Sequence, residues 1–104
     1  MKFAKSVIAM VKILPANDLN SRLSDQSARS ATAIGANYLE ANDGLGKKDF
    51  LFKLRIARKE AKEALYWLNL ILEANIDLED IIAPLVQEAR ELKNILSTII
   101  IKSE

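Results

Sequence analysis

The feature that most constrains the fold of this chain is a spacing of apolar residues that alternates between four and three positions. Four segments show this helical period, and no segment alternates apolar and polar residues over the length of a strand. Such a period places the side chains on one face of a helix, where they can pack against other helices. The sequence therefore predicts an all-α protein, with one domain over residues 1–104.

The first and last predicted helices carry the most regular apolar faces. The first covers residues 3–14 and stops at Pro15, because proline disfavours helix at the residue before it. Its face consists of Phe3, Val7, Met10 and Leu14. The last helix is expected to begin after Asp77 as N-cap, and Pro84 either kinks it or marks its first turn. Its face consists of Leu78, Ile82, Leu85, Ala89, Leu92, Leu96 and Ile99.

The second predicted helix covers residues 18–41, with Asp18 as N-cap. Its expected buried face consists of Leu19, Leu23, Gln26, Ser30, Ala33, Asn37 and Glu40, which are mostly small or polar. The segment 42–46 is the clearest break in the chain, because Gly44 and Gly46 permit positive φ and glycine is acceptable at an N-cap.

The third predicted helix covers residues 47–74 and has two apolar stripes. The first consists of Phe50, Leu54, Ala57, Ala61, Leu65 or Ala64, Leu68 and Leu72, and it is expected to face the core. The second lies roughly opposite and consists of Phe52, Ile56, Trp67 and Leu70. Because one stripe can face the core and the other needs another partner, we predict that this outer stripe is an interface between subunits. The four helices and their short connections predict an antiparallel up-down-up-down bundle.

Composition excludes several kinds of site. The chain has no His and no Cys, which removes histidine-dependent catalysis, thiol nucleophiles, disulfides and the common zinc ligands. We therefore expect no enzyme activity, no metal and no cofactor. No apolar run approaches the length of a membrane span, and the short N-terminal apolar stretch is interrupted by Lys12. We expect a soluble, cytoplasmic protein with no membrane partner.

Charge is concentrated in the third predicted helix. The whole chain carries a net charge of +1, but residues 47–62 hold seven basic and two acidic residues, a net charge of +5. Six of these cations fall within about 120° of an ideal helical wheel. They are Lys47, Lys48, Arg55, Arg58, Lys59 and Lys62, called the basic arc below. An arc of this kind is either a solvated face or a phosphate-binding surface.

Polar residues on the predicted seams have a structural and a chemical interpretation. We favour a buried network that fixes helix register or subunit contacts, formed by Gln26, Arg29, Asn37, Glu40 and Glu63. The alternative is a carboxylate-based metal or catalytic site that uses Glu40, Glu60 and Glu63. Tyr66 and Trp67 could form a platform for stacked bases, but we favour Trp67 as an interface residue and leave Tyr66 open.

Two blocks of sequence resemble one known family. The first matches the pattern Gln-x-x-Arg-Ser-x-x-Ser-Ile-x-Ala-Asn-x-x-Glu-Ala at Gln26, Arg29, Ser30, Ile34, Ala36, Asn37, Glu40 and Ala41, and departs from it at Ala33. The second, residues 49–68, matches the pattern Ile-Ala-x-x-Glu-Ala-x-Glu-x-x-Tyr-Trp-Leu. The chain thus resembles the four-helix bundle proteins associated with intervening sequences in bacterial large-subunit ribosomal RNA genes. A related branch is the accessory variability determinant of diversity-generating retroelements.

The resemblance implies a four-helix bundle that assembles as a ring-shaped homopentamer, and it implies no established activity. The related branch binds nucleic acid. Together with the basic arc, this favours a non-enzymatic adaptor that binds RNA or DNA. The alternatives are a structural module that binds only another protein, and the carboxylate-based metal enzyme.

Overall fold

The computed structural model describes residues 2–104, so Met1 of the predicted domain lies outside the described residues. The helices are α1 (Lys2–Ile13), α2 (Asp18–Asn42), α3 (Lys47–Ala74) and α4 (Glu79–Ser103), with a short 3₁₀ helix η1 (Ile76–Leu78) before α4. Residues 2–104 contain no strand. The fold is all-α with four α-helices, as the sequence predicts.

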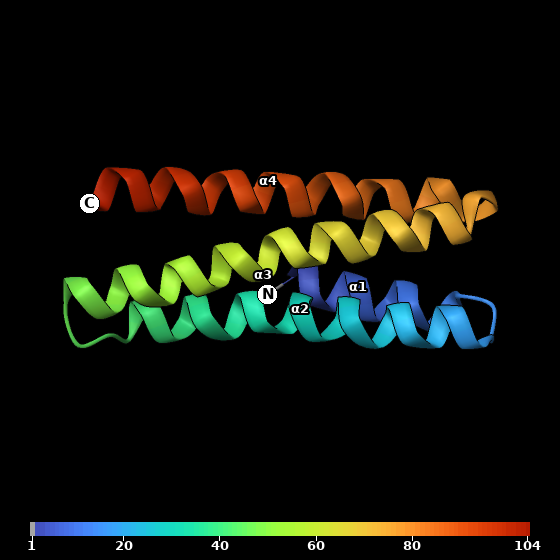
Figure 1. Cartoon of the computed structure of the whole chain (residues 1–104), viewed down its shortest axis with the longest axis horizontal. Coiled ribbons are helices and arrows are strands. Elements are labelled where there is room, and N and C mark those ends of the chain that lie inside the picture. The colour runs from blue at the N-terminus through green and yellow to red at the C-terminus, as the bar shows by residue number, and fades with distance from the viewer. Residues whose placement is uncertain (1) are drawn as a thin grey trace.

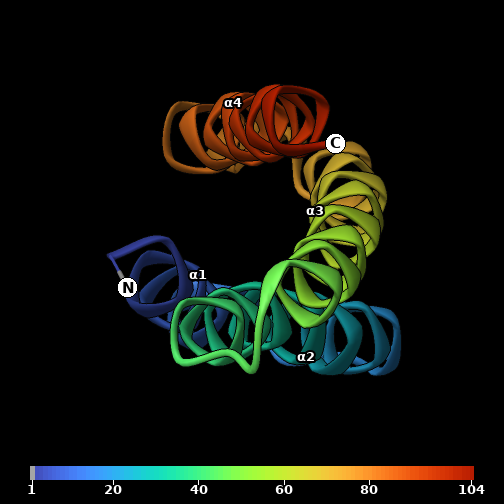
Figure 2. The same ribbon diagram turned by 90° about the vertical axis from the view of Figure 1, so that its left-hand side faces the viewer.

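The helices lie along one axis, and each connection reverses the direction of the chain (Figure 1). The molecule measures 45 × 18 × 18 Å. Viewed along that axis, α2, α3 and α4 follow one another around the centre, and α1 lies beside α2 (Figure 2). The turns α1–α2 and α3–α4 therefore lie at one end of the molecule, and the turn α2–α3 lies at the other.

The core contains most of the apolar seams expected from the sequence. In α1, Phe3, Val7 and Met10 are buried, while Leu14 packs against the core and is half-buried. The buried face of α3 consists of Leu51, Leu54, Ala57, Ala61, Ala64, Leu68 and Ile71. That of α4 consists of Ile82, Leu85, Val86, Ala89, Leu96 and Ile100. The predicted seam residues Phe50, Leu65, Leu72, Leu78, Leu92 and Ile99 pack against this core at its edge.

In the predicted face of α2, Leu23 and Ser30 are buried as expected, but elsewhere the buried face is displaced by one position. The buried residues are Asn20, Leu23, Ser24, Ser27, Ser30, Ala31, Ile34 and Ala41. Leu19 is 55% exposed, and Gln26 and Glu40 are exposed too. Between Leu23 and Ile34 the helix has no large apolar side chain, so the sequence pattern there does not distinguish two adjacent faces.

Local signals set most of the helix ends. Asn17, rather than the predicted Asp18, caps α2, because its side-chain Oδ1 accepts from the backbone N–H of Asn20 at 2.8 Å. Gly46 caps α3 with φ +114°, whereas Gly44 lies where an added Cβ would meet the carbonyl oxygen of Ala41 at 2.8 Å. Residues 76–78 form a 3₁₀ turn that contains Asp77, so the N-cap of α4 is Leu78 and not the predicted Asp77. Helix α4 continues through Pro84.

A candidate nucleic-acid interface on α3

The basic arc runs along the outer surface of α3. Five of its side chains belong to exposed residues, and Arg58 is half-buried. Among residues 2–104, the arc makes one ion pair, between Arg55 Nη2 and Glu104 Oε2 at 3.1 Å. The cations of Lys47, Lys48, Arg58, Lys59 and Lys62 have no carboxylate within ion-pair distance in this part of the chain. The arc therefore presents uncompensated positive charge to solvent.

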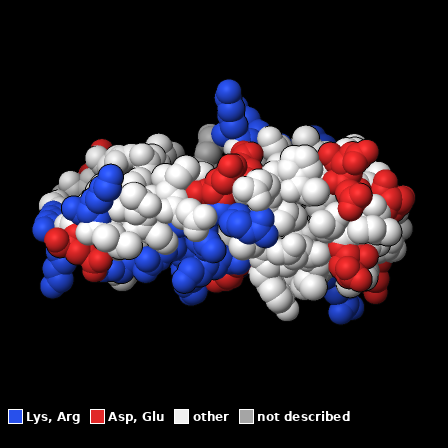
Figure 3. Space-filling model, turned by 90° about the horizontal axis from the view of Figure 1, so that it is seen from above, with Lys and Arg blue, Asp and Glu red and all other residues white. Residues whose placement is uncertain are grey.

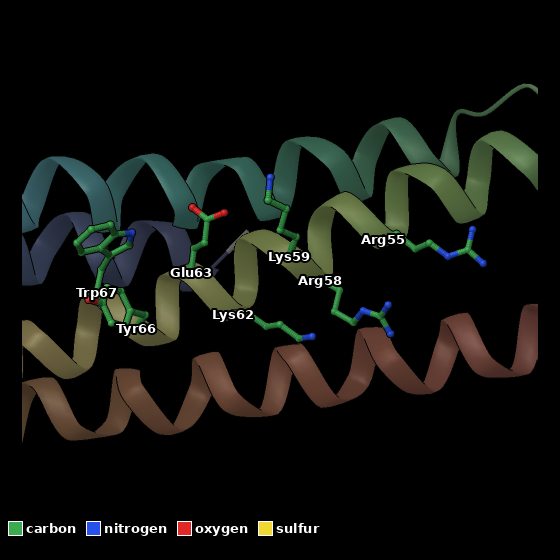
Figure 4. A pocket seen from close by; sticks show the side chains of 7 residues that line it. All are labelled: Arg55, Arg58, Lys59, Lys62, Glu63, Tyr66 and Trp67. Carbon is green, nitrogen blue, oxygen red and sulfur yellow. The ribbon is translucent and has the colours of Figure 1, made fainter.

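Part of the arc surrounds a shallow hollow with a volume of about 350 Å³. Its lining consists of Arg55, Arg58, Lys59, Lys62, Glu63, Tyr66 and Trp67 (Figure 4). Lys47 and Lys48 do not line it. Figure 4 shows Lys59 and Glu63 rising toward α2, and Arg58 and Lys62 leaning toward α4. The hollow thus joins the cations to the two aromatic rings, a grouping that wheel geometry alone did not predict.

The aromatic pair forms one end of the hollow. The rings of Tyr66 and Trp67 meet edge to face, with centroids 5.0 Å apart and planes at 68°. Tyr66 is 57% exposed, whereas Trp67 is half-buried and packs against the core. The indole Nε1 of Trp67 is buried and has no hydrogen-bond partner within residues 2–104. Tyr66 therefore offers an accessible ring, and Trp67 supports it.

The predicted interface stripe is interrupted. On an ideal wheel, Lys59 and Glu63 fall on the same side of α3 as the stripe, between Ile56 and Trp67. Phe52 is 58% exposed, while Ile56, Trp67 and Leu70 are half-buried. Trp67 and Leu70 pack against the chain's own core. Phe52 is consequently the most accessible member of this stripe, and its use as a subunit contact stays a prediction.

The predicted polar network is not buried within one chain, and its expected role in subunit contacts stays a prediction. Gln26, Arg29 and Glu40 are exposed, and Asn37 and Glu63 are half-buried. The charged members Arg29, Glu40 and Glu63 have long side chains, whose charged ends stay in contact with water.

Arg29 is the centre of the polar contacts that do form. It donates to Gln26 Oε1 at 3.3 Å, to Glu60 Oε1 at 3.2 Å and to Glu63 Oε1 at 2.8 Å. The pKa of Arg29 is raised above its ordinary value, chiefly by the hydrogen bond to Glu63. Glu60 is the partner that the predicted network omitted, although it lies only one turn before Glu63.

The other members of the predicted network lie apart from Arg29. Asn37 Nδ2 donates to the backbone oxygen of Ala33 at 2.9 Å, and Glu40 pairs with Lys53 at 3.3 Å. The carboxylates of the alternative metal site are thus divided between two cations. Residues 2–104 contain no group of three or more His, Cys, Asp or Glu arranged to hold a metal ion.

A buried polar pair that we did not predict lies at the other end of the bundle. Asn20 and Asn75 are each 4% exposed. Asn20 Nδ2 donates to Asn75 Oδ1 at 3.0 Å, and Asn75 Nδ2 donates to Asn20 Oδ1 at 2.8 Å. Their second amide hydrogens reach the backbone oxygens of Pro15 and Ile71. Asn20 follows the α1–α2 turn and Asn75 begins the α3–α4 turn. Because an up-down bundle places these two turns at the same end, the sequence positions of the two amides could have identified the pair.

These features define a class: a small four-helix bundle protein with a cationic surface on its third helix. The chain belongs to the 23S rRNA-intervening sequence protein family, whose model matches residues 1–98. It is also similar to a solved protein of unknown function from the S23 ribosomal protein family of Bacteroides thetaiotaomicron. The two share 33% sequence identity and a TM-score of 0.81, over 95% of this chain and 92% of that one. A comparison with curated proteins found no match.

In residues 2–104, no helix is both long and apolar enough to cross a membrane.

Proposed function

We propose that this protein is a non-enzymatic adaptor that binds RNA or DNA through the basic arc. The observation that carries the proposal is the set of five arc cations without an ion-pair partner in residues 2–104. Cations held on one helix face without internal counter-charges attract the phosphates of a nucleic-acid backbone. Such a face contacts the charged phosphates of the nucleic-acid backbone and makes no base-specific contact by itself.

The distribution of charge over the molecule supports the same surface. Figure 3 shows most of the blue basic atoms over the left and centre of the molecule, with some red acidic atoms among them, and several red patches at its right end. The acidic end includes Asp77, Glu79 and Asp80 at the start of α4. A polyanion is therefore steered toward α3 and away from the α3–α4 turn.

Self-association is part of the proposal. Family resemblance supports a ring-shaped homopentamer, and the exposed Phe52 of the outer stripe is a suitable contact. An oligomer repeats the arc on every subunit, so weak phosphate contacts combine through multivalency.

A charge-matched pair of variants tests the arc. One variant replaces Lys48, Arg55, Lys59 and Lys62 by Ala. The control replaces four exposed cations outside the arc, Lys5, Lys12, Arg22 and Arg90, by Ala, so both lose the same charge. We expect the arc variant to bind an RNA or DNA duplex at least about 10-fold more weakly and with a flatter salt dependence, by about 0.9 in log–log slope per lost phosphate contact. Equal losses in both variants would show that net charge, not the arc, governs binding.

A further inference from the structure

The hollow on α3 combines cations with aromatic rings, whereas the arc consists of cations alone. At its rim lie four cations of the arc, and at one end lie the rings of Tyr66 and Trp67. Its one acidic residue, Glu63, is held by Arg29 at 2.8 Å, so that its charge is already neutralised. Arg55 is paired with Glu104, but an anionic group can approach Arg58, Lys59 and Lys62 without displacing an internal ion pair.

The cations lie at helical intervals from the aromatic pair. Lys62 and Tyr66 are four residues apart, which places them on the same face of α3 with about 6 Å of rise between them. Arg58 precedes Lys62 by one further turn. Arg58, Lys62 and Tyr66 therefore follow one another along α3 (Figure 4). A polymer that carries both anionic groups and flat rings can place its anionic groups at Arg58 and Lys62 and one ring at Tyr66.

The accessible ring belongs to Tyr66. It is 57% exposed, and the edge-to-face contact with Trp67 fixes it from one side. A fixed aromatic ring with an open face stacks on a nucleobase for about 1–3 kcal/mol. The hollow's volume, about 350 Å³, lies at the low end of ligand pockets and is suited to a single ring system.

We propose that this hollow binds an unpaired nucleobase of single-stranded nucleic acid, which stacks on Tyr66 while the adjacent phosphates contact Lys62 and Arg58. This inference rests on the proposed function and adds strand selectivity to it. The bases of a duplex are stacked on one another and cannot enter the hollow, so a duplex contacts only the cations. The single strand therefore gains the stacking energy that the duplex lacks.

The chain provides its own probe, because Trp67 is its only tryptophan. Fluorescence excited selectively from tryptophan, without excitation of the two tyrosines, thus reports on the hollow. The full-length protein is titrated with oligothymidylate, with a duplex of the same length and with heparin, a polyanion that has no bases. We expect oligothymidylate to quench Trp67 and to bind at least about 10-fold more tightly than the duplex, the ratio that one stacking contact supplies. Heparin is expected to bind without comparable quenching.

Two tyrosines allow a matched mutational test. Tyr66→Ala is expected to weaken single-strand binding about 10-fold and leave duplex binding unchanged. Tyr66→Phe keeps the ring and should keep the affinity. The control is Tyr38→Ala on α2, since Tyr38 is also exposed, at 40%, but lies outside the hollow. Circular dichroism checks that each variant is folded, as expected for exposed positions.

The outcomes separate this inference from the proposed function. Equal binding of single strand and duplex, with no effect of Tyr66→Ala, would overturn the stacking site and leave the arc as a phosphate-binding surface. Equal quenching by heparin would also overturn it, because charge alone would then explain the response. Binding to none of the three polyanions would overturn both proposals.

Discussion

Asn20 and Asn75, separated by 55 positions in the chain, each donate a side-chain amide hydrogen to the other's carbonyl oxygen. The pair joins the start of α2 to the end of α3. With the additional bonds to Pro15 and Ile71, it ties both turns at this end of the molecule together. A buried amide that is fully paired fixes one relative position of two helices, because any shift leaves polar groups without partners.

Replacing one member of this pair should destabilise the fold. Asn20→Ala leaves the Asn75 amide buried without its partner, and we expect a loss of about 2 kcal/mol in the free energy of unfolding. The measurement is urea denaturation followed by circular dichroism. Asn69→Ala, at an exposed position of α3, is the control and should change stability little. If both variants unfold at the same urea concentration, the pair contributes no more than a surface amide.

The start of α3 depends on the backbone conformation of Gly46. At φ +114° and ψ 179°, a residue with a Cβ is strained, so Gly46→Ala should lower the free energy of unfolding by about 2 kcal/mol. Leu45→Ala is the control, since Leu45 is 96% exposed and adjoins Gly46. Comparable melting temperatures for the two variants would contradict this role of the glycine.

Arg29 offers a test of partly exposed ion pairs. Its partner Glu60 has a side chain only 13% exposed, whereas Arg22 and Asp18 form a pair with side chains 80% and 95% exposed. We expect Arg29→Leu to cost about 1 kcal/mol of stability, and Arg22→Leu close to none, because solvent screens the second pair. Denaturation at low and high salt concentration measures both, and the difference between the variants should shrink at high salt. A larger effect at Arg22 would invalidate this ranking.

Much of the fold could be predicted because large apolar side chains repeat with a helical period. Phe3, Val7 and Met10 in α1, and Ile82, Leu85 and Ala89 in α4, are buried where their spacing indicates. The face of α2 could not be predicted in the same way. There, serine and alanine occupy both candidate faces, and burial is decided by the helices that pack against them.

The candidate site was only partly predictable for a related reason. Charge and helical spacing identify the arc, since both depend on sequence alone. The hollow depends on the way Tyr66 and Trp67 pack against each other, and on the Arg29 bond that removes Glu63 as a counter-charge. These are tertiary contacts between α2 and α3, or rotamer choices within α3, and spacing does not specify them.

Phe52 provides the sharpest test of self-association. It is 58% exposed on the outer face of α3, so replacing it should disturb contacts between subunits more than the core. We expect Phe52→Asp to reduce the mass of the assembly in native mass spectrometry, because an interface that buries this ring would instead bury a charge. Helicity should stay unchanged. Leu45→Asp introduces the same charge at a 96% exposed position in the α2–α3 turn and should leave the mass as it is. A folded Phe52→Asp protein with the wild-type mass would exclude Phe52 from the interface, whereas loss of mass in both variants would place the contact at the turn.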